Sequence, residues 1–308
     1  MSDQNPHENA YSALLADDAS AGDAHWAFGT DFEDPLAGVD TTVPDGADPA
    51  ELAVYCLMLG DDALVLAQRL AEWCSRAPDL EEDIALANIA LDLLGQARLL
   101  LSRAAAADPR VVPALPDGSP VPDEDRLAFF RAGSAFRNVR LCEAPNGDFA
   151  ETIARILLFS AWRYALFARL ADSRDPVLAA IAAKGVKELA YHRDFAGRWF
   201  VTLARGTAES RRRLTAALDG LWPLYDEPFH THEVERSLTD AGIGVDPALL
   251  AADVDAALAP VLAASGLSQP SVAAVAGASG RDGRHTPALT ALLTDMQSVA
   301  RAHPEGRW

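Results

Sequence analysis

The stretch LGDDALVLAQRLAEWCSRAPDLEEDIALANIALDLLGQARLLL, residues 59–101, decides the fold of this chain. Its apolar residues recur at alternating steps of three and four, the spacing of one face of an α-helix. The pattern starts near Glu51, and the apolar seam of this first helix consists of Leu52, Cys56, Leu59, Ala63, Leu66, Leu70 and Trp73. Pro78 ends the helix and Asp79 can cap the next one, so the stretch predicts two long helices joined by a tight turn.

A second pair of long helices is predicted further along the chain. After the turn signal at residues 144–147, Asp148 can cap a helix to about residue 170, and Pro176 opens another, to about residue 205. The last of these has an inward seam of Leu178, Ile181, Gly185, Leu189, His192, Ala196, Trp199 and Leu203. The helix over residues 80–106 is apolar around most of its circumference, so we expect it to lie inside the bundle.

These helices predict an all-α fold. Two helical hairpins joined by a crossover of about 40 residues are typical of a ferritin-like four-helix bundle. Additional peripheral helices are expected near residues 208–221, 232–241, 247–264 and 286–302, and the alternation typical of strands is absent.

Charge divides the 308-residue chain into two parts. Its net charge is −19, and residues 1–50 hold eleven acidic residues and no Lys or Arg. We expect residues 1–48 to form an acidic disordered tail and residues 49–308 a single helical domain. In the tail, the aromatic residues Trp26, Phe28 and Phe32 are a candidate segment for docking onto a partner protein.

Several classes of protein are disfavoured by the composition. The acidic balance argues against a nucleic-acid-binding surface. The chain has no long apolar run free of charge and no basic start typical of a signal peptide, so we expect a cytoplasmic protein without a membrane span. Cys56, Cys74 and Cys142 show no CxxC spacing and are expected to be buried free thiols.

The polar residues inside the predicted helices can be compared with a di-iron site. Ferritin-like oxygenases use a Glu on each of two helices and a Glu-x-x-His on each of the other two. Here Asp92 is followed by Gly95 and Gln96, and Glu188 is separated from His192 by one residue too many. Only one imidazole is available where two are needed. We therefore interpret Asp92, Gln96, Glu188 and His192 as a buried polar network at degenerate di-iron positions, and predict no catalytic, cofactor-binding or metal-binding residue in this chain.

Four blocks of the sequence resemble the C-subunit family of phenylacetyl-CoA epoxidase, also called ring 1,2-phenylacetyl-CoA monooxygenase. The blocks are residues 59–101, 143–176, 182–195 and 280–308. The resemblance, which runs from about residue 52 to the C-terminus, implies a ferritin-like fold and a structural, non-catalytic component of an oxidoreductase of aerobic phenylacetate degradation. It also implies assembly with a homologous catalytic A subunit that holds a di-iron centre and the CoA thioester. A small B subunit and a flavin and iron-sulfur reductase, which uses NADPH, complete such a system.

Two other functions stay open at this point. One is a di-metal carboxylate oxygenase whose own site consists of Glu72, Asp92, Glu151, Glu188 and His192. The other is a helical binding module that recruits a basic protein through its acidic tail.

Overall fold

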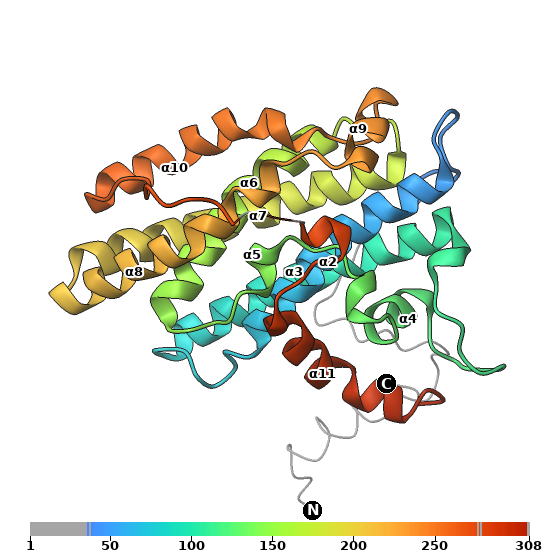
Figure 1. Cartoon of the computed structure of the whole chain (residues 1–308), viewed down its shortest axis with the longest axis horizontal. Helices are drawn as coiled ribbons and strands as arrows, with labels where there is room; N and C mark the ends of the chain where they lie inside the picture. Colours follow the sequence, from blue (N-terminus) through green and yellow to red (C-terminus); the bar gives the residue numbers. More distant parts are fainter. Residues whose placement is uncertain (1–35, 37, 276, 278, 307–308) are drawn as a thin grey trace, which may run out of the picture. The chain divides into compact units, whose positions relative to one another are not determined.

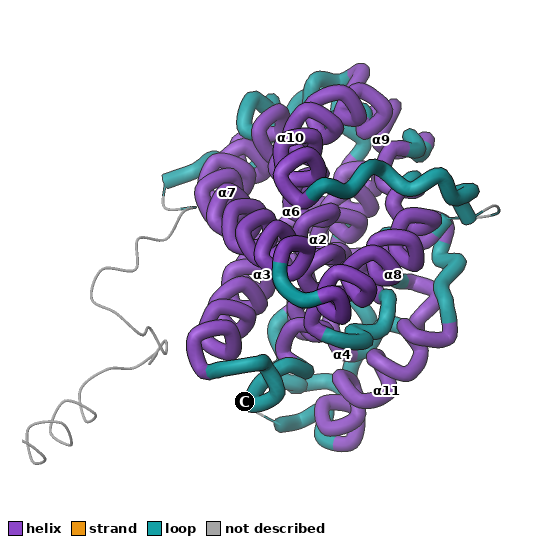
Figure 2. Tube along the Cα trace, turned by 90° about the vertical axis from the view of Figure 1, so that its left-hand side faces the viewer, coloured by secondary structure: helices purple, strands orange, loops and turns teal. Residues whose placement is uncertain are grey.

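Four long helices form the centre of the molecule. The structure, a computed structural model, describes residues 36, 38–275, 277 and 279–306, and these contain helices but no strand (Figure 2). The long helices are α2 (Pro49–Ala71), α3 (Leu80–Ala107), α6 (Phe149–Leu170) and α7 (Pro176–Arg205). They pair as α2 with α3 and α6 with α7, and residues 108–148 cross from one hairpin to the other (Figure 1). This is the ferritin-like four-helix bundle expected from the sequence.

The ends of these helices lie where their capping residues predicted. Asp79 accepts a hydrogen bond from the backbone N–H of Glu82, at the start of α3. Asp148 and Glu151 form a reciprocal capping box at the start of α6. Pro176 is the first residue of α7. Each cap satisfies backbone donors that have no partner within the helix.

Shorter helices cover the bundle on different sides. Helices α8 (Ala208–Tyr225) and α10 (Ala251–Ser265) pack on the α6–α7 hairpin, and α9 (Glu233–Asp240) packs on α2. The crossover contains α4 (Asp123–Phe129) and α5 (Arg140–Glu143). Helix α11 (Pro287–Ala302), near the end of the chain, packs against α4 (Figure 1). The expected peripheral helices are therefore present. Short 3-10 helices occur at Pro109–Val111, Gly133–Ala135, Glu227–Phe229, Pro247–Leu250 and Gly280–Asp282.

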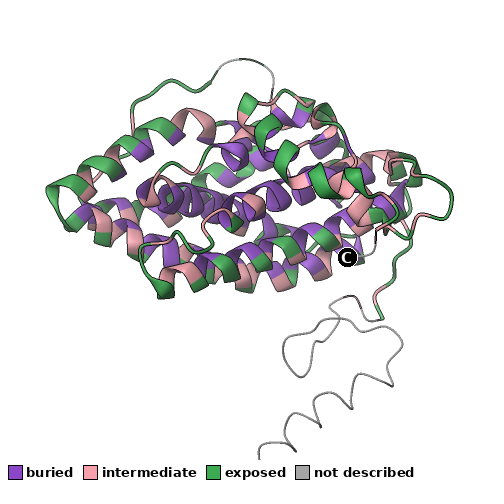
Figure 3. Cartoon of the chain, turned by 90° about the horizontal axis from the view of Figure 1, so that it is seen from below, coloured by how far each residue is buried: buried purple, intermediate pink, exposed green. Residues whose placement is uncertain are grey.

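Two expectations about burial are wrong. Helix α3 is not enclosed, because Leu80, Ile84, Leu91 and Leu94 are exposed. Exposed residues occur along the outer sides of the helices (Figure 3). A bundle helix buries only the face that is turned toward its neighbours, and the described residues supply no cover for the opposite face. Cys74 is exposed, because it lies in the turn between α2 and α3, whereas the other two cysteines are buried.

Most of the predicted tail is outside the described residues. Residues 1–35, with Trp26, Phe28 and Phe32, belong to this part. Residues 38–48 are described, and the buried Arg103 of α3 donates hydrogen bonds to the carbonyl groups of Thr41 and Thr42.

The largely enclosed side chain of a histidine joins the C-terminal segment to the crossover. His285 Nδ1 lies 2.8 Å from Oε2 of Glu143, and Nε2 lies 3.0 Å from the carbonyl oxygen of Phe136. Two acceptors favour the doubly protonated imidazolium. Burial lowers the pKa of His285, but these hydrogen bonds outweigh it and leave the pKa above its usual value. Burial raises the pKa of Glu143, but the hydrogen bonds that this carboxylate accepts have the larger combined effect and leave its pKa below the usual value.

The stabilising effect of this contact should depend on pH. A group whose pKa is raised by folding stabilises the protein fully below its unfolded pKa, about 6.5 for His, and loses that effect as the pH rises through the folded pKa. We expect His285→Gln to reduce the free energy of unfolding most at mildly acidic pH and progressively less at alkaline pH. Urea unfolding over a pH series measures this, with the exposed His303→Gln as control. A loss of unfolding free energy in His285→Gln that is the same at every pH would contradict the prediction.

Candidate functional site

Two polar pairs connect α3 with α7. Nε2 of His192 lies 2.9 Å from Oδ2 of Asp92. One turn further along α3, the side-chain amide of Gln96 donates a 2.9 Å hydrogen bond to Oε2 of Glu188. The structure thus brings together the four residues that the sequence placed at the degenerate positions, as two pairs. His192 and Gln96 are buried, whereas the carboxylates of Asp92 and Glu188 are partly exposed.

Close packing fixes the second pair. Gly185 lies on α7 against the ring of Phe167, and a β-carbon at this position would lie 2.6 Å from that ring and 3.4 Å from the amide nitrogen of Gln96. Glycine is therefore required for the approach of α6, α3 and α7 at this level. Burial raises the pKa of Glu188, opposed by the hydrogen bond from Gln96. Lys184, whose Nζ lies 3.6 Å from Glu188, also favours the charged carboxylate.

A buried arginine occupies the interior next to these pairs. Nε of Arg163, on α6, donates a 3.0 Å hydrogen bond to Oε1 of Gln96, and Nη2 donates a 3.1 Å hydrogen bond to the carbonyl oxygen of Leu59 on α2. Its guanidinium carbon lies 4.4 Å from the centre of the Phe167 ring. Burial lowers the pKa of Arg163 to about 10, which still leaves it charged at neutral pH. A fixed positive charge therefore connects α6 directly with α2 and α3, and with α7 through Gln96.

Two adjacent carboxylates of α2 balance the charge of the interior. Asp61 and Asp62 are completely buried. Arg131, from the crossover, donates to both carboxylate oxygens of Asp61. Arg281, near the C-terminus, donates to both oxygens of Asp62 at 3.0 and 2.9 Å. Nη1 of Arg163 lies 4.0 Å from Asp62 on the other side. Burial raises the pKa of Asp62, and the two arginines oppose this effect.

The sequence interpretation missed these charged residues. Asp61 and Asp62 interrupt an otherwise apolar segment of α2, and Arg163 interrupts an apolar segment of α6. Charged residues at positions that the helical period assigns to the core were the available signal, because such groups require partners. The identity of the partners could not be read from it.

Glu72 and Glu151 are not part of this arrangement. Glu72, at the end of α2, accepts hydrogen bonds from Arg69 and Asn146. The side chain of Glu151 accepts the backbone N–H of Asp148 in the capping box. Both lie at the end of the bundle where α3 begins, about three helical turns from Asp92. Arg155, one helical turn after Glu151, donates to the Ala144 carbonyl and to Asn146.

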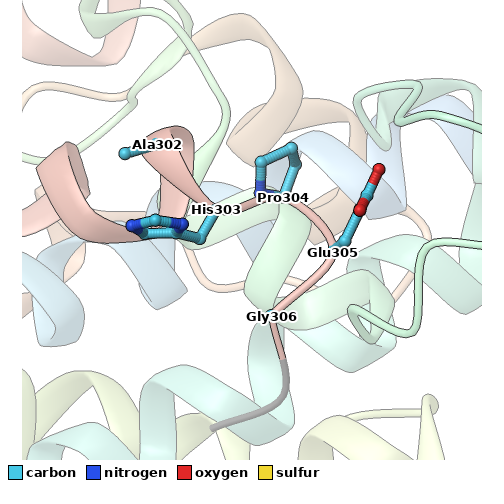
Figure 4. A pocket seen from close by; sticks show the side chains of 5 residues that line it. All are labelled: Ala302, His303, Pro304, Glu305 and Gly306. Atoms are coloured by element: carbon cyan, nitrogen blue, oxygen red, sulfur yellow. The ribbon is translucent and has the colours of Figure 1, made fainter.

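Two other surface features contain none of the four candidate residues. Among the described residues, Asp79, Glu81 and Glu82 at the start of α3 form a compact group of potential metal ligands. A hollow at the C-terminal end is lined by five consecutive residues, Ala302 to Gly306 (Figure 4). Its two ionisable side chains, His303 and Glu305, lie apart from each other. Neither feature joins different helices of the bundle, so neither resembles the α3–α7 site.

Breaking the pair of Arg281 and Asp62 by removing one partner should destabilise the protein. Removing one partner of a buried ion pair leaves an uncompensated charge and costs about 3 to 5 kcal/mol. We expect Arg281→Met to lower the free energy of unfolding by about this amount, whereas the exposed Arg284→Met should change it by less than about 0.5 kcal/mol. The double variant Asp62→Asn/Arg281→Met should lose less than the sum of its single variants. Equal stability of the Arg281→Met and Arg284→Met proteins in urea unfolding would contradict this account.

Comparison with known proteins agrees with the resemblance carried by the four sequence blocks. Residues 39–308 match the family described as Phenylacetic acid catabolic protein. A curated relative, the C subunit of 1,2-phenylacetyl-CoA epoxidase from Escherichia coli (strain K12), is 44% identical over 258 residues. The alignment covers 84% of this chain and 99% of that protein. The chain therefore belongs to the family of phenylacetic acid catabolic proteins.

Proposed function

We propose that this chain is a non-catalytic structural subunit of a multicomponent phenylacetyl-CoA 1,2-epoxidase, and that it braces a homologous di-iron A subunit in the cytoplasm. The relative from Escherichia coli is a subunit of such an epoxidase by name, and nearly its whole length aligns with this chain. An epoxidase of this kind combines the A subunit with a small B subunit and a flavin and iron-sulfur reductase.

The observation that carries the proposal is the position of Arg163. Two iron ions need carboxylate and imidazole ligands and carry a high positive charge. In this chain a guanidinium that is charged at neutral pH is hydrogen-bonded to Gln96, at one of the degenerate positions, and places a positive charge beside it. The imidazole of His192 is held by Asp92, and a second imidazole is absent from the α3–α7 pairs. These groups fit a di-iron centre poorly, which supports a structural role.

The same network gives a physical basis for bracing. A catalytic bundle must hold its ligands within narrow tolerances while it admits a bulky thioester. Here buried ion pairs connect α2 with the crossover and with the C-terminal segment, and Arg163 connects α2, α3 and α6. Buried charge pairs resist distortion, because separating them inside the protein is costly. A rigid subunit of this kind can support a partner that has to open and close.

The first test is turnover. We expect this chain with reductase but without the A subunit to convert no phenylacetyl-CoA, because its α3–α7 pairs offer one imidazole and lie beside a competing cation. Addition of the A subunit should restore turnover. Epoxide formation can be followed by chromatography of the CoA thioesters. Turnover without the A subunit would favour the alternative, a di-metal carboxylate oxygenase with its own metal site, over our proposal.

The second test concerns His192. Replacing a buried hydrogen-bonded group costs about 1 to 3 kcal/mol, so we expect His192→Ala to lower the melting temperature of the chain. The exposed His230→Ala should leave it unchanged. Iron per A subunit in the assembled His192→Ala complex should equal that of the wild type. A variant of normal stability that has lost iron from this chain would show a metal ligand and overturn the proposal.

A further inference from the structure

The outer side of α3 carries a continuous apolar stripe. Leu80, Ile84, Leu91 and Leu94 are exposed by 69, 52, 63 and 47%. Their spacing of four, seven and three residues places them on one face of the helix, and the exposed Ala87 fills the interval. Of the nine large apolar side chains exposed in the described part of the chain, these four are on one helix. Such a concentration marks a surface that is covered in the assembled protein.

Helix α7 exposes a further large side chain next to one of the α3–α7 pairs. Tyr191 is 46% exposed and stacks on Phe195, with ring centres 6.4 Å apart. It directly precedes His192, which contacts Asp92 on α3. Aromatic side chains with a polar end, like aliphatic ones, are common in protein interfaces.

The charges beside the stripe are of one sign along most of its length. Residues 77–97 contain Asp79, Glu81, Glu82, Asp83 and Asp92, and no Lys or Arg. The next basic residue, Arg98, is paired with Glu124 of α4. On α7, Lys184 is paired with Glu188, and Lys187 is exposed one turn before Tyr191. The surface complementary to α3 is therefore an apolar one with basic residues along its edge.

This charge pattern disfavours three other occupants. The acidic N-terminal segment of the chain would be repelled, because residues 1–50 contain eleven acidic and no basic side chains. A second copy would bring the same five acids and the same net charge of −19 to the interface. Helix α3 is apolar and long enough to cross a membrane, but half of the apolar window is buried in the bundle, and anionic lipids would be repelled by the acidic edge.

We propose that the outer face of α3, with Tyr191 of α7, is the docking surface for a helix of the catalytic A subunit, and that this helix presents an apolar stripe flanked by Lys and Arg. The inference rests on the proposed function for the choice of partner. Docking here buries Leu91 at the centre of the contact and places the acidic start of α3 opposite basic side chains. It also covers the seam between α3 and α7, where the carboxylates of Asp92 and Glu188 are partly exposed.

The test is a comparison of variants in binding to the purified A subunit. We expect Leu91→Asp to raise the Kd at least about tenfold, because a charge is then buried at the centre of the interface. The matched control is Val299→Asp on α11, where the native side chain is 56% exposed; it should change the Kd by less than about twofold. Glu81→Lys should also weaken binding, and more so at low salt, whereas Glu233→Lys, exposed in the first turn of α9, should not. Melting curves verify that each variant is folded.

The outcomes separate the docking surface from the proposed function. If the Leu91→Asp variant binds the A subunit as tightly as the wild type does, the docking surface is overturned and the proposed function is left intact. No binding of the wild type to the A subunit overturns both. Self-association of the wild type that Leu91→Asp abolishes assigns the face to a second copy, and binding to phosphatidylglycerol vesicles that Leu91→Asp abolishes assigns it to a membrane; either result overturns the proposal.

Discussion

Asp61 and Asp62 of α2 place two neighbouring carboxylates in the buried interior of the bundle, and each needs a cation beside it. The cations come from distant parts of the chain: Arg131 from the crossover, Arg281 from the C-terminal segment and Arg163 from α6. The guanidinium of Arg281 also donates to the carbonyl groups of Met58 and Arg137. The requirement to neutralise two charges thus determines where the crossover and the C-terminal segment lie on the bundle. Gly280, next to Arg281, allows the close approach to the Asn138 backbone that this position requires.

The same electrostatics governs the interior as a possible metal site. A four-helix bundle of this type can hold two iron ions, but a guanidinium that is charged at neutral pH competes with them for the carboxylates and repels them. The polar groups between α3 and α7 form hydrogen bonds with each other, Asp92 with His192 and Gln96 with Glu188. On the outside of the same helix, an apolar stripe has no cover among the described residues. An interior held together by internal charge pairs and an outer face prepared for contact are the properties expected of a bracing subunit.

The fold could be predicted from the sequence because its signals are local. Apolar spacing and the caps Asp79 and Asp148 located the long helices closely, and the crossover between two hairpins indicated the bundle. The four α3–α7 residues were singled out by comparison with the ligand positions of a di-iron bundle, and the structure places them in two pairs. The ion pairs were not predicted, because Asp62 and Arg281 are 219 residues apart and helical period carries no information about such contacts. Nor could periodicity show that the outer side of α3 is exposed, because the sequence pattern of an apolar helix face does not depend on whether the same chain or another chain covers that face.

The central claim is that the interior of this bundle is neutralised by arginine and contains no iron in the working complex. Anomalous diffraction at the iron absorption edge, from crystals of the assembled and active epoxidase, tests it most directly because it locates iron atom by atom. The account predicts no anomalous peak within this chain, and iron peaks only in the A subunit and, where the reductase is present, in its iron-sulfur cluster, with Arg163 of this chain hydrogen-bonded to Gln96 as described. An iron peak between α3 and α7 of this chain, coordinated by His192 with Arg163 displaced, would contradict it.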